Sequence, residues 1–135
     1  MRRPRVLLVD DTPEIIEFCS DVLAADYEIV GTAPDGVSAL ALAEETAPDV
    51  VVLDVTMPEL NGIEVAKRLR SAGFRGAIVF LSGSGEYEAA ALDAGGSSFV
   101  SKAKIGSDLQ VAIAEALAGR RFVSEPPREP GEDQT

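Results

Sequence analysis

Residues 50–62 read VVVLDVTMPELNG, and this stretch contains the pattern that decides the fold class. Its first part, residues 50–53, is a continuous apolar run with no polar alternation, which is typical of a strand buried on both faces of a parallel sheet. The run ends at a carboxylate, Asp54, and Asn61-Gly62 indicates a turn before the next helical pattern. A doubly buried strand implies that further strands and covering helices lie on either side of it in the sequence.

Apolar runs and helical patterns alternate along most of the chain. We expect strands at residues 6–9, 28–31, 50–53, 77–81 and 98–100, and helices at residues 15–23, 37–45, 62–71, 86–94 and 109–117. Strict alternation of strand and helix predicts a parallel sheet with helices on both faces, and right-handed crossovers make it doubly wound. The fold class is therefore α/β, with a five-stranded parallel sheet.

The length of 135 residues fits a single domain, which we place at residues 1–121. Residues 122–135 are rich in proline and acidic residues and cannot build a core, so we expect a disordered tail there. Three arginines near the start resemble the charged region of a signal peptide, but only four apolar residues follow them. No apolar run reaches the length that a membrane span needs, and we expect a cytoplasmic protein.

The composition excludes several kinds of chemistry. There are 23 acidic and 12 basic side chains, a net charge of -11, and such a surface repels the phosphate backbone of a nucleic acid. The chain has no histidine, so it cannot itself provide a phosphohistidine, an imidazole base or an imidazole ligand for zinc. Its one cysteine, Cys19, can form no internal disulfide and falls on the apolar stripe of the first helix, as a small buried hydrophobe would.

Three carboxylates follow two of the expected strands. Asp10 and Asp11 come just after the first strand, and Asp54 just after the third. Ligands of open parallel sheets bind at the carboxyl ends of the strands, so the three carboxylates converge if these strands are neighbours. Their mutual repulsion would raise their pKa values, and a hard divalent cation with oxygen ligands removes it. Mg²⁺ is the usual choice when a phosphate shares the coordination shell.

Two further polar groups face the same edge of the predicted sheet. Ser82 follows the fourth strand and Lys102 the fifth. A metal site, a carboxylate nucleophile, a cation and a hydroxyl together suit phosphorylation of a carboxyl group. Each residue also has a simpler interpretation: Asp11 could cap the first helix with Glu14 as capping-box partner, Asp54 could be an ordinary loop carboxylate, residues 82–85 could be a flexible helix entry, and Lys102 could be a solvated surface lysine.

The motifs together resemble the receiver domain of bacterial two-component response regulators over residues 5–118. Residues 6–11, VLLVDD, are similar to the family's first strand and acidic pair, and residues 54–62, DVTMPELNG, to its phosphoacceptor and following loop. Ser82, Phe99 and Lys102 stand where the family has a hydroxyl residue, an aromatic switch residue and a lysine. The resemblance implies a flavodoxin-like (βα)5 fold with strand order 2-1-3-4-5.

The resemblance also implies roles for these residues. Asp54 would accept a phosphoryl group from a sensor histidine kinase or a histidine phosphotransfer protein. Asp11, Asp54 and the backbone carbonyl of Thr56 would bind Mg²⁺ directly, and Asp10 would do so through water. Lys102 and Ser82 would contact the phosphoryl group, and Ser82 with Phe99 would switch a surface that binds an unknown output protein. Such a protein is a self-phosphorylating and self-dephosphorylating switch rather than an enzyme.

The sequence departs from the family pattern at three places. Ala103 follows the lysine where most members have a cis proline, and a cis bond before a non-proline costs about 3–4 kcal/mol, so this loop is expected to be trans or strained. Phe99 lacks the hydroxyl of the tyrosine often found there. Residues 118–124 resemble a junction that leads to a helix-turn-helix domain in one subfamily, but the sequence ends at Thr135, so we expect a receiver without an output domain.

Three other functions are compatible with parts of the sequence. A pseudo-receiver would keep the fold for protein contacts and take no phosphate. A small phosphohydrolase with an aspartyl nucleophile would need a second aspartate where Thr56 stands, and a cap domain. A flavin-binding relative would have only residues 82–85 as a phosphate cradle, and aromatic residues make up 5% of the chain. A weak homodimer through the fourth or fifth helix is compatible with their apolar residues.

Overall fold

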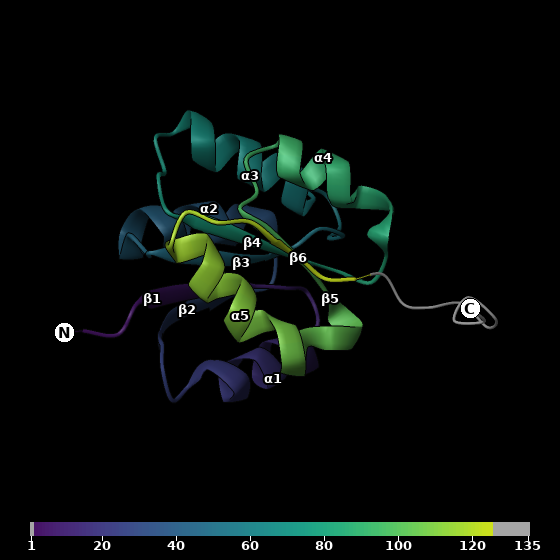
Figure 1. Cartoon of the computed structure of the whole chain (residues 1–135). Coiled ribbons are helices and arrows are strands. Elements are labelled where there is room, and N and C mark those ends of the chain that lie inside the picture. Colours follow the sequence, from purple (N-terminus) through teal and green to yellow (C-terminus); the bar gives the residue numbers. More distant parts are fainter. Residues whose placement is uncertain (1, 126–135) are drawn as a thin grey trace, which may run out of the picture.

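The continuous apolar runs of the sequence form the middle of a parallel sheet. The computed structural model describes residues 2–125. The strands are β1 (Arg5–Val9), β2 (Glu28–Ala33), β3 (Val50–Asp54), β4 (Ala77–Ser82), β5 (Ser98–Ser101) and β6 (Phe122–Val123). They lie in the order β2-β1-β3-β4-β5-β6 (Figure 1). The α/β class and the predicted order of the first five strands are confirmed.

Helices cover both faces of the sheet, as the crossovers require. They are α1 (Pro13–Leu23), α2 (Gly36–Thr46), α3 (Gly62–Ser71), α4 (Glu88–Asp93) and α5 (Ile105–Leu117), with short 3-10 turns η1 (Gly85–Tyr87) and η2 (Lys102–Lys104). In Figure 1, α1 and α5 lie on one face, and α2, α3 and α4 lie on the other. None of the helices within residues 2–125 combines the length and the apolar character needed to cross a membrane.

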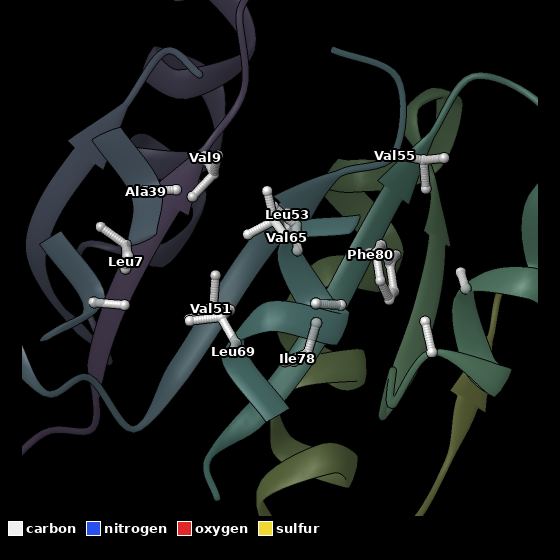
Figure 2. Close-up of a cluster of buried hydrophobic side chains, with 14 of the residues drawn as sticks. Leu7, Val9, Ala39, Val51, Leu53, Val55, Val65, Leu69, Ile78 and Phe80 are labelled. Atoms are coloured by element: carbon white, nitrogen blue, oxygen red, sulfur yellow. The ribbon is translucent and has the colours of Figure 1, made fainter. Parts of the chain in front are cut away.

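Alternate residues of the central strands supply two separate cores. Val51, Leu53, Ile78 and Phe80 face α2, α3 and α4 (Figure 2), whereas their neighbours Val50, Val52, Val79 and Leu81 pack with α1 and α5. All eight are at most 1% exposed, and each side chain contributes roughly 1.5–3 kcal/mol by leaving water. Because the central strands are packed on both faces, the residues at their carboxyl ends are held in fixed positions.

Cys19 belongs to the core beside α1 and α5, where it is 1% exposed. Burial raises the pKa of its thiol to about 12, and the nearby charge of Asp10 adds to the rise while Lys102 opposes it. The thiol is therefore protonated at neutral pH and is an apolar packing group, as the sequence indicated.

The expected count of five strands and the expected boundary at Arg121 both differ from the structure. Phe122 and Val123 form a sixth strand that pairs with β5, and Ser124 beyond it is 6% exposed. A two-residue strand has too few positions to show a period, and the proline-rich sequence after it has the composition of a tail. The ordered domain therefore continues through Ser124, and residues 126–135 of the predicted tail lie outside the described part of the chain.

Candidate phosphoacceptor site

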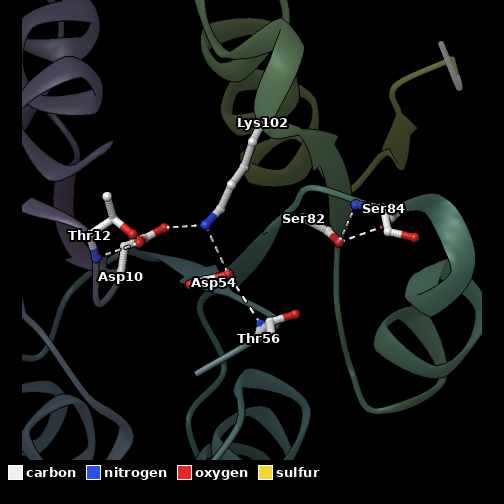
Figure 3. A network of polar contacts seen from close by, with 7 residues as sticks. All are labelled: Asp10, Thr12, Asp54, Thr56, Ser82, Ser84 and Lys102. Atoms are coloured by element: carbon white, nitrogen blue, oxygen red, sulfur yellow. Dashed lines mark hydrogen bonds and ion pairs between the residues drawn. The ribbon is translucent and has the colours of Figure 1, made fainter. Parts of the chain in front are cut away.

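The carboxyl ends of four strands bring the predicted residues to one edge of the sheet. Asp10 and Asp11 follow β1, Asp54 is the last residue of β3, Ser82 ends β4, and Lys102 follows β5. Figure 3 shows the side chain of Lys102 reaching between Asp10 and Asp54, with Ser82 on the adjoining strand. The site therefore combines residues that are up to 92 positions apart in the sequence, from Asp10 to Lys102.

Lys102 bridges two of the carboxylates. Its Nζ lies 3.0 Å from Asp10 Oδ2 and 3.2 Å from Asp54 Oδ1. Both carboxylate side chains are at most 2% exposed, so the ion pairs are largely removed from water. No peptide bond among residues 2–125 is cis, so the Lys102–Ala103 bond is trans, and the lysine reaches the site without the family's proline. The Ser101 hydroxyl accepts a hydrogen bond from Ala103 N at 3.2 Å and closes this turn.

The loop after β3 holds the Asp54 carboxylate from the other side. The Thr56 N–H donates to Asp54 Oδ1 at 3.1 Å, and Gly62 N–H donates to the Val55 carbonyl at 2.9 Å. A Cβ atom at Gly62 would lie only 2.0 Å from the backbone oxygen of Asp54, so glycine is required for α3 to begin this close to β3. Asn61 then caps α3 by accepting from the Glu64 N–H at 3.0 Å.

The electrostatics of Asp54 follow from its surroundings. Burial raises the pKa of Asp54 to about 6, and the negative charge of Asp10 adds to the rise, whereas Lys102 and the Thr56 N–H act in the opposite direction. Burial alone would lower the pKa of Lys102, but its contacts with Asp10 and Asp54 outweigh that effect and raise the pKa. At neutral pH the site therefore holds a charged lysine between two carboxylates whose repulsion is only partly offset.

The acidic cluster offers the carboxylate oxygens that a divalent cation site needs, and two of them accept no hydrogen bond. Oxygens of Asp10, Asp11 and Asp54 all lie within 4.8 Å of one another. Asp54 Oδ2 is buried and accepts no hydrogen bond, and Asp10 Oδ2 faces only the lysine ammonium as an ion pair. Asp11 is exposed, and the N-cap position of α1 is Thr12, whose side chain makes no capping hydrogen bond. Three carboxylates this close together, with one lysine to offset their charge, fit a hard cation such as Mg²⁺.

The sequence did not indicate what orients Asp10. The Thr12 N–H donates to Asp10 Oδ1 at 2.8 Å, which turns the other oxygen toward Lys102. This contact is a backbone bond two residues along the chain, and only the preference of aspartate for such local turns could have suggested it.

The hydroxyl of Ser82 points to its own loop in this state. Ser82 Oγ donates to the Ser84 carbonyl at 2.6 Å and accepts from the Ser84 N–H at 3.1 Å (Figure 3). The other predicted switch residue, Phe99, is 3% exposed and packs in the core beside α2, α3 and α4. The structure therefore places Ser82 at the same sheet edge as Asp54 but with its hydroxyl engaged elsewhere, and it places the Phe99 ring inward.

Residues 6–114 match the family described as the response regulator receiver domain. This chain belongs to that family. The receiver is 35% identical over 124 residues to the nitrate/nitrite response regulator NarL of Escherichia coli K12, a match that covers 89% of this chain and 57% of that protein. It is 42% identical over 110 residues to a protein-glutamate methylesterase/protein-glutamine glutaminase of Nocardioides, covering 76% of this chain and 30% of that protein. The receiver thus spans less than two thirds of either relative.

Solved structures give the same result for the fold. A two-component response regulator of the LuxR family from Aurantimonas superposes on the receiver with a TM-score of 0.84, at 33% identity, over 90% of this chain and 89% of that one. The receiver domain of a NarL-type regulator from Mycobacterium tuberculosis also superposes with a TM-score of 0.84. The two are 30% identical, and the match covers 89% of this chain and 100% of that one. These matches favour a signalling receiver over the phosphohydrolase and flavin-binding alternatives.

Proposed function

We propose that this receiver accepts a phosphoryl group on Asp54 from the phosphohistidine of a sensor histidine kinase or a histidine phosphotransfer protein. The observation that carries the proposal is Asp54 Oδ2, a buried carboxylate oxygen with no hydrogen-bond donor beside a charged lysine. Such an oxygen is free to attack phosphorus. These 135 residues contain no histidine, so the phosphohistidine donor lies outside them.

The proposed phosphoryl transfer forms one bond and breaks one. An Asp54 oxygen forms the new bond to phosphorus while the bond from phosphorus to the donor imidazole nitrogen breaks. That nitrogen keeps the electron pair and takes up a proton from the solvent. Lys102, which already contacts Asp54 Oδ1 at 3.2 Å, supplies positive charge where the phosphoryl oxygens come to lie. Ser82, once it leaves Ser84, can donate its hydroxyl hydrogen to one of those oxygens.

We propose Mg²⁺ as the cofactor, with Asp11, Asp54 and the Thr56 backbone carbonyl as direct ligands and Asp10 acting through a water molecule. When bound, Mg²⁺ offsets the charge of the clustered carboxylates and of the transferring phosphoryl group. The exposure of Asp11 supports this assignment, because its carboxylate is open to an arriving hydrated ion while that of Asp10 is bound to Thr12 and Lys102.

The proposed output is binding to another protein. A net charge of -11 makes a nucleic acid an unsuitable direct partner for this part of the molecule. Loss of the Ser82–Ser84 hydrogen bonds on phosphorylation would reshape the surface around α4, β5 and α5, because Ser82 ends the strand that pairs with β5. A phosphoryl group that binds better to one of two packed states shifts the balance between them.

The test is an intact-mass spectrum after incubation with acetyl phosphate, a small phosphoryl donor, in Mg²⁺ or in a chelator. We expect a gain of one phosphoryl group that requires Mg²⁺ and is absent in Asp54→Asn. The matched control is Asp49→Asn, which removes a partly exposed carboxylate at the opposite end of β3 and leaves the gain intact. A receiver that gains nothing in any condition would instead be a phosphorylation-independent binding module.

A further inference from the structure

Residues Phe122–Ser124 lie along the outer edge of β5, and we call them the strap. β6 pairs in parallel with β5, with Ser98 opposite Phe122 and Phe99 opposite Val123 (Figure 1). The Ser124 N–H extends the pairing by donating to the Phe99 carbonyl at 2.9 Å. The predicted switch residue is therefore bonded directly to the strap through its backbone.

The strap is anchored on both faces of the sheet. Phe122 packs against the core beside α1 and α5, and Val123 packs against the core beside α2, α3 and α4. The Phe122 N–H also donates to Ser98 Oγ at 3.2 Å, and that hydroxyl donates to the Ala112 carbonyl of α5 at 3.2 Å. Two neighbouring side chains that point to opposite faces make the strap sensitive to movement on either side of β5.

A hydrogen-bonded clasp closes the far end of the strap. Ser124 Oγ donates to Asp108 Oδ2 at 2.6 Å and accepts from the Ser101 N–H at 3.1 Å. Ser101 directly precedes Lys102, the residue that bridges Asp10 and Asp54. The clasp is therefore one residue away from the phosphoacceptor site along β5.

A small hollow separates the clasp from the loop that holds Ser82. It measures about 30 Å³, and its lining includes Ser82 and Ser84 from the loop, Phe99 and Ser101 from β5, and Ser124 from the strap. The loop wall is fixed by the two hydrogen bonds between Ser82 and Ser84. A turn of the Ser82 hydroxyl toward Asp54 breaks both bonds, which frees this wall of the hollow to move.

We propose that the strap is a conformational coupling element: it is docked on β5 while Asp54 is unmodified, and it undocks when Ser82 turns toward a phosphoryl group on Asp54. This inference rests on the proposed function of Asp54. Moving the loop wall widens the hollow and removes packing from Ser124. The strap then keeps its pairing with β5, its side-chain packing and the clasp but loses the support of the loop wall, and undocking leaves the Phe99 carbonyl and the Ser101 N–H at a free sheet edge.

The coupling has to be reciprocal, because linkage between two binding equilibria acts equally in both directions. If a phosphoryl group on Asp54 loosens the strap, then loosening the strap by mutation strengthens binding at Asp54. The test therefore uses beryllium fluoride with Mg²⁺ as the probe, since it mimics a phosphoryl group and binds reversibly. Bound fluoride is followed by ¹⁹F NMR, and the strap is followed by exchange of the Ser101, Phe122 and Ser124 amide hydrogens.

In the wild-type chain, we expect bound beryllium fluoride to lower the protection of these three amides while the Phe80 amide of β4 stays protected. Ser124→Ala, which removes the clasp hydroxyl, should expose the same amides without the probe and bind the probe at least about fivefold more tightly. The matched control is Ser107→Ala, which removes the other hydroxyl bonded to Asp108 and leaves the strap contacts in place, so it should behave as wild type.

The outcomes separate the two proposals. A probe that binds while the three amides keep or gain protection overturns the coupling and leaves the function of Asp54 standing. Equal affinity of wild type and Ser124→Ala for the probe also overturns it. A probe that does not bind at all counts against Asp54 as phosphoacceptor, and the coupling falls with it.

Discussion

The Nζ of Lys102 lies 3.2 Å from Oδ1 of Asp54, and the same nitrogen lies 3.0 Å from Asp10. One cation thus partly neutralises two carboxylates that are almost fully buried. Removal of the lysine leaves two buried carboxylates without a partner, which costs more than an exposed ion pair contributes. The stability of the receiver therefore depends on the same lysine that the proposed phosphoryl transfer would use.

Lys102→Met keeps the length of the side chain but removes its charge. In a chelator at pH 7.5, we expect the variant to lose about 3–5 kcal/mol of unfolding free energy, measured by urea titration, because Asp10 and Asp54 then repel each other unopposed. Mg²⁺ should restore part of the loss. Lys104→Met, two residues on and with no ion pair in the described structure, should change stability by less than about 0.5 kcal/mol. Equal losses in the two variants would contradict this account of Lys102.

Asp54 makes the metal-free receiver less stable as pH rises. Its pKa is about 6 in the folded state against 3.8 ordinarily, so the folded state binds its proton more tightly than the unfolded chain does. The stabilisation that protonated Asp54 provides is complete below about pH 4 and is lost as pH rises through about 6. Asp54→Asn should therefore become more stable than wild type by up to about 3 kcal/mol between pH 4 and 7.

Asp35 is the control for Asp54, because its pKa shifts in the opposite direction. Hydrogen bonds from the Ser38 backbone lower the pKa of Asp35, so Asp35 stabilises the fold above its ordinary pKa and loses that effect in acid. The stability difference between Asp35→Asn and wild type should thus change with pH in the opposite direction to that of Asp54→Asn. Chemical unfolding at a series of pH values in a chelator measures both, and a pH-independent difference for Asp54→Asn would contradict the assigned pKa.

Asp11 and Asp10 should contribute unequally to Mg²⁺ binding. The Asp10 carboxylate is occupied by the Thr12 N–H and Lys102, whereas Asp11 is exposed. Asp11→Ala should raise the dissociation constant for Mg²⁺ at least about tenfold more than Asp10→Ala, as measured by isothermal titration calorimetry. The reverse order would mean that Asp10 is the direct ligand.

Ala47 ends α2 in the left-handed conformation, with φ 47° and ψ 62°. A side chain costs about 1–2 kcal/mol there and glycine does not, so Ala47→Gly should stabilise the fold by about 0.5–1 kcal/mol after the greater chain entropy of unfolded glycine is subtracted. Ala72→Gly is the matched control, because Ala72 ends α3 with φ -81° and should lose stability instead. Thermal unfolding measures both, and a lower melting temperature for Ala47→Gly would contradict the expected relief.

The sequence predicted that the candidate site residues meet at one edge of the sheet, because the ends of the strands can be read from the sequence. Asp10 and Asp54 each stand at the end of a continuous apolar run, Lys102 follows the short strand at Ser98–Ser101, and a parallel sheet brings such strand ends to one edge. The bounds of α3 agree with the expected residues 62–71 because Asn61 caps the helix and Gly62 starts it. In these places the local sequence and the global fold favour the same structure.

The remaining features depend on contacts that leave no periodic pattern. Phe122 and Val123 become a strand only because Ser98 and Phe99, more than twenty positions earlier, offer an edge. The direction of the Ser82 hydroxyl is determined by the backbone of Ser84, which the residue types do not reveal. The segment expected as a helix over residues 86–94 begins as the 3-10 turn η1 and is helical only at Glu88–Asp93.

The most direct test of the central claim is to locate the phosphoryl group itself. After phosphorylation with acetyl phosphate and Mg²⁺, borohydride reduces an acyl phosphate on aspartate to homoserine, and peptide mapping identifies the position. We predict homoserine at position 54 and intact aspartate at positions 10 and 11. Homoserine at either of those positions, with Asp54 unchanged, would contradict the account.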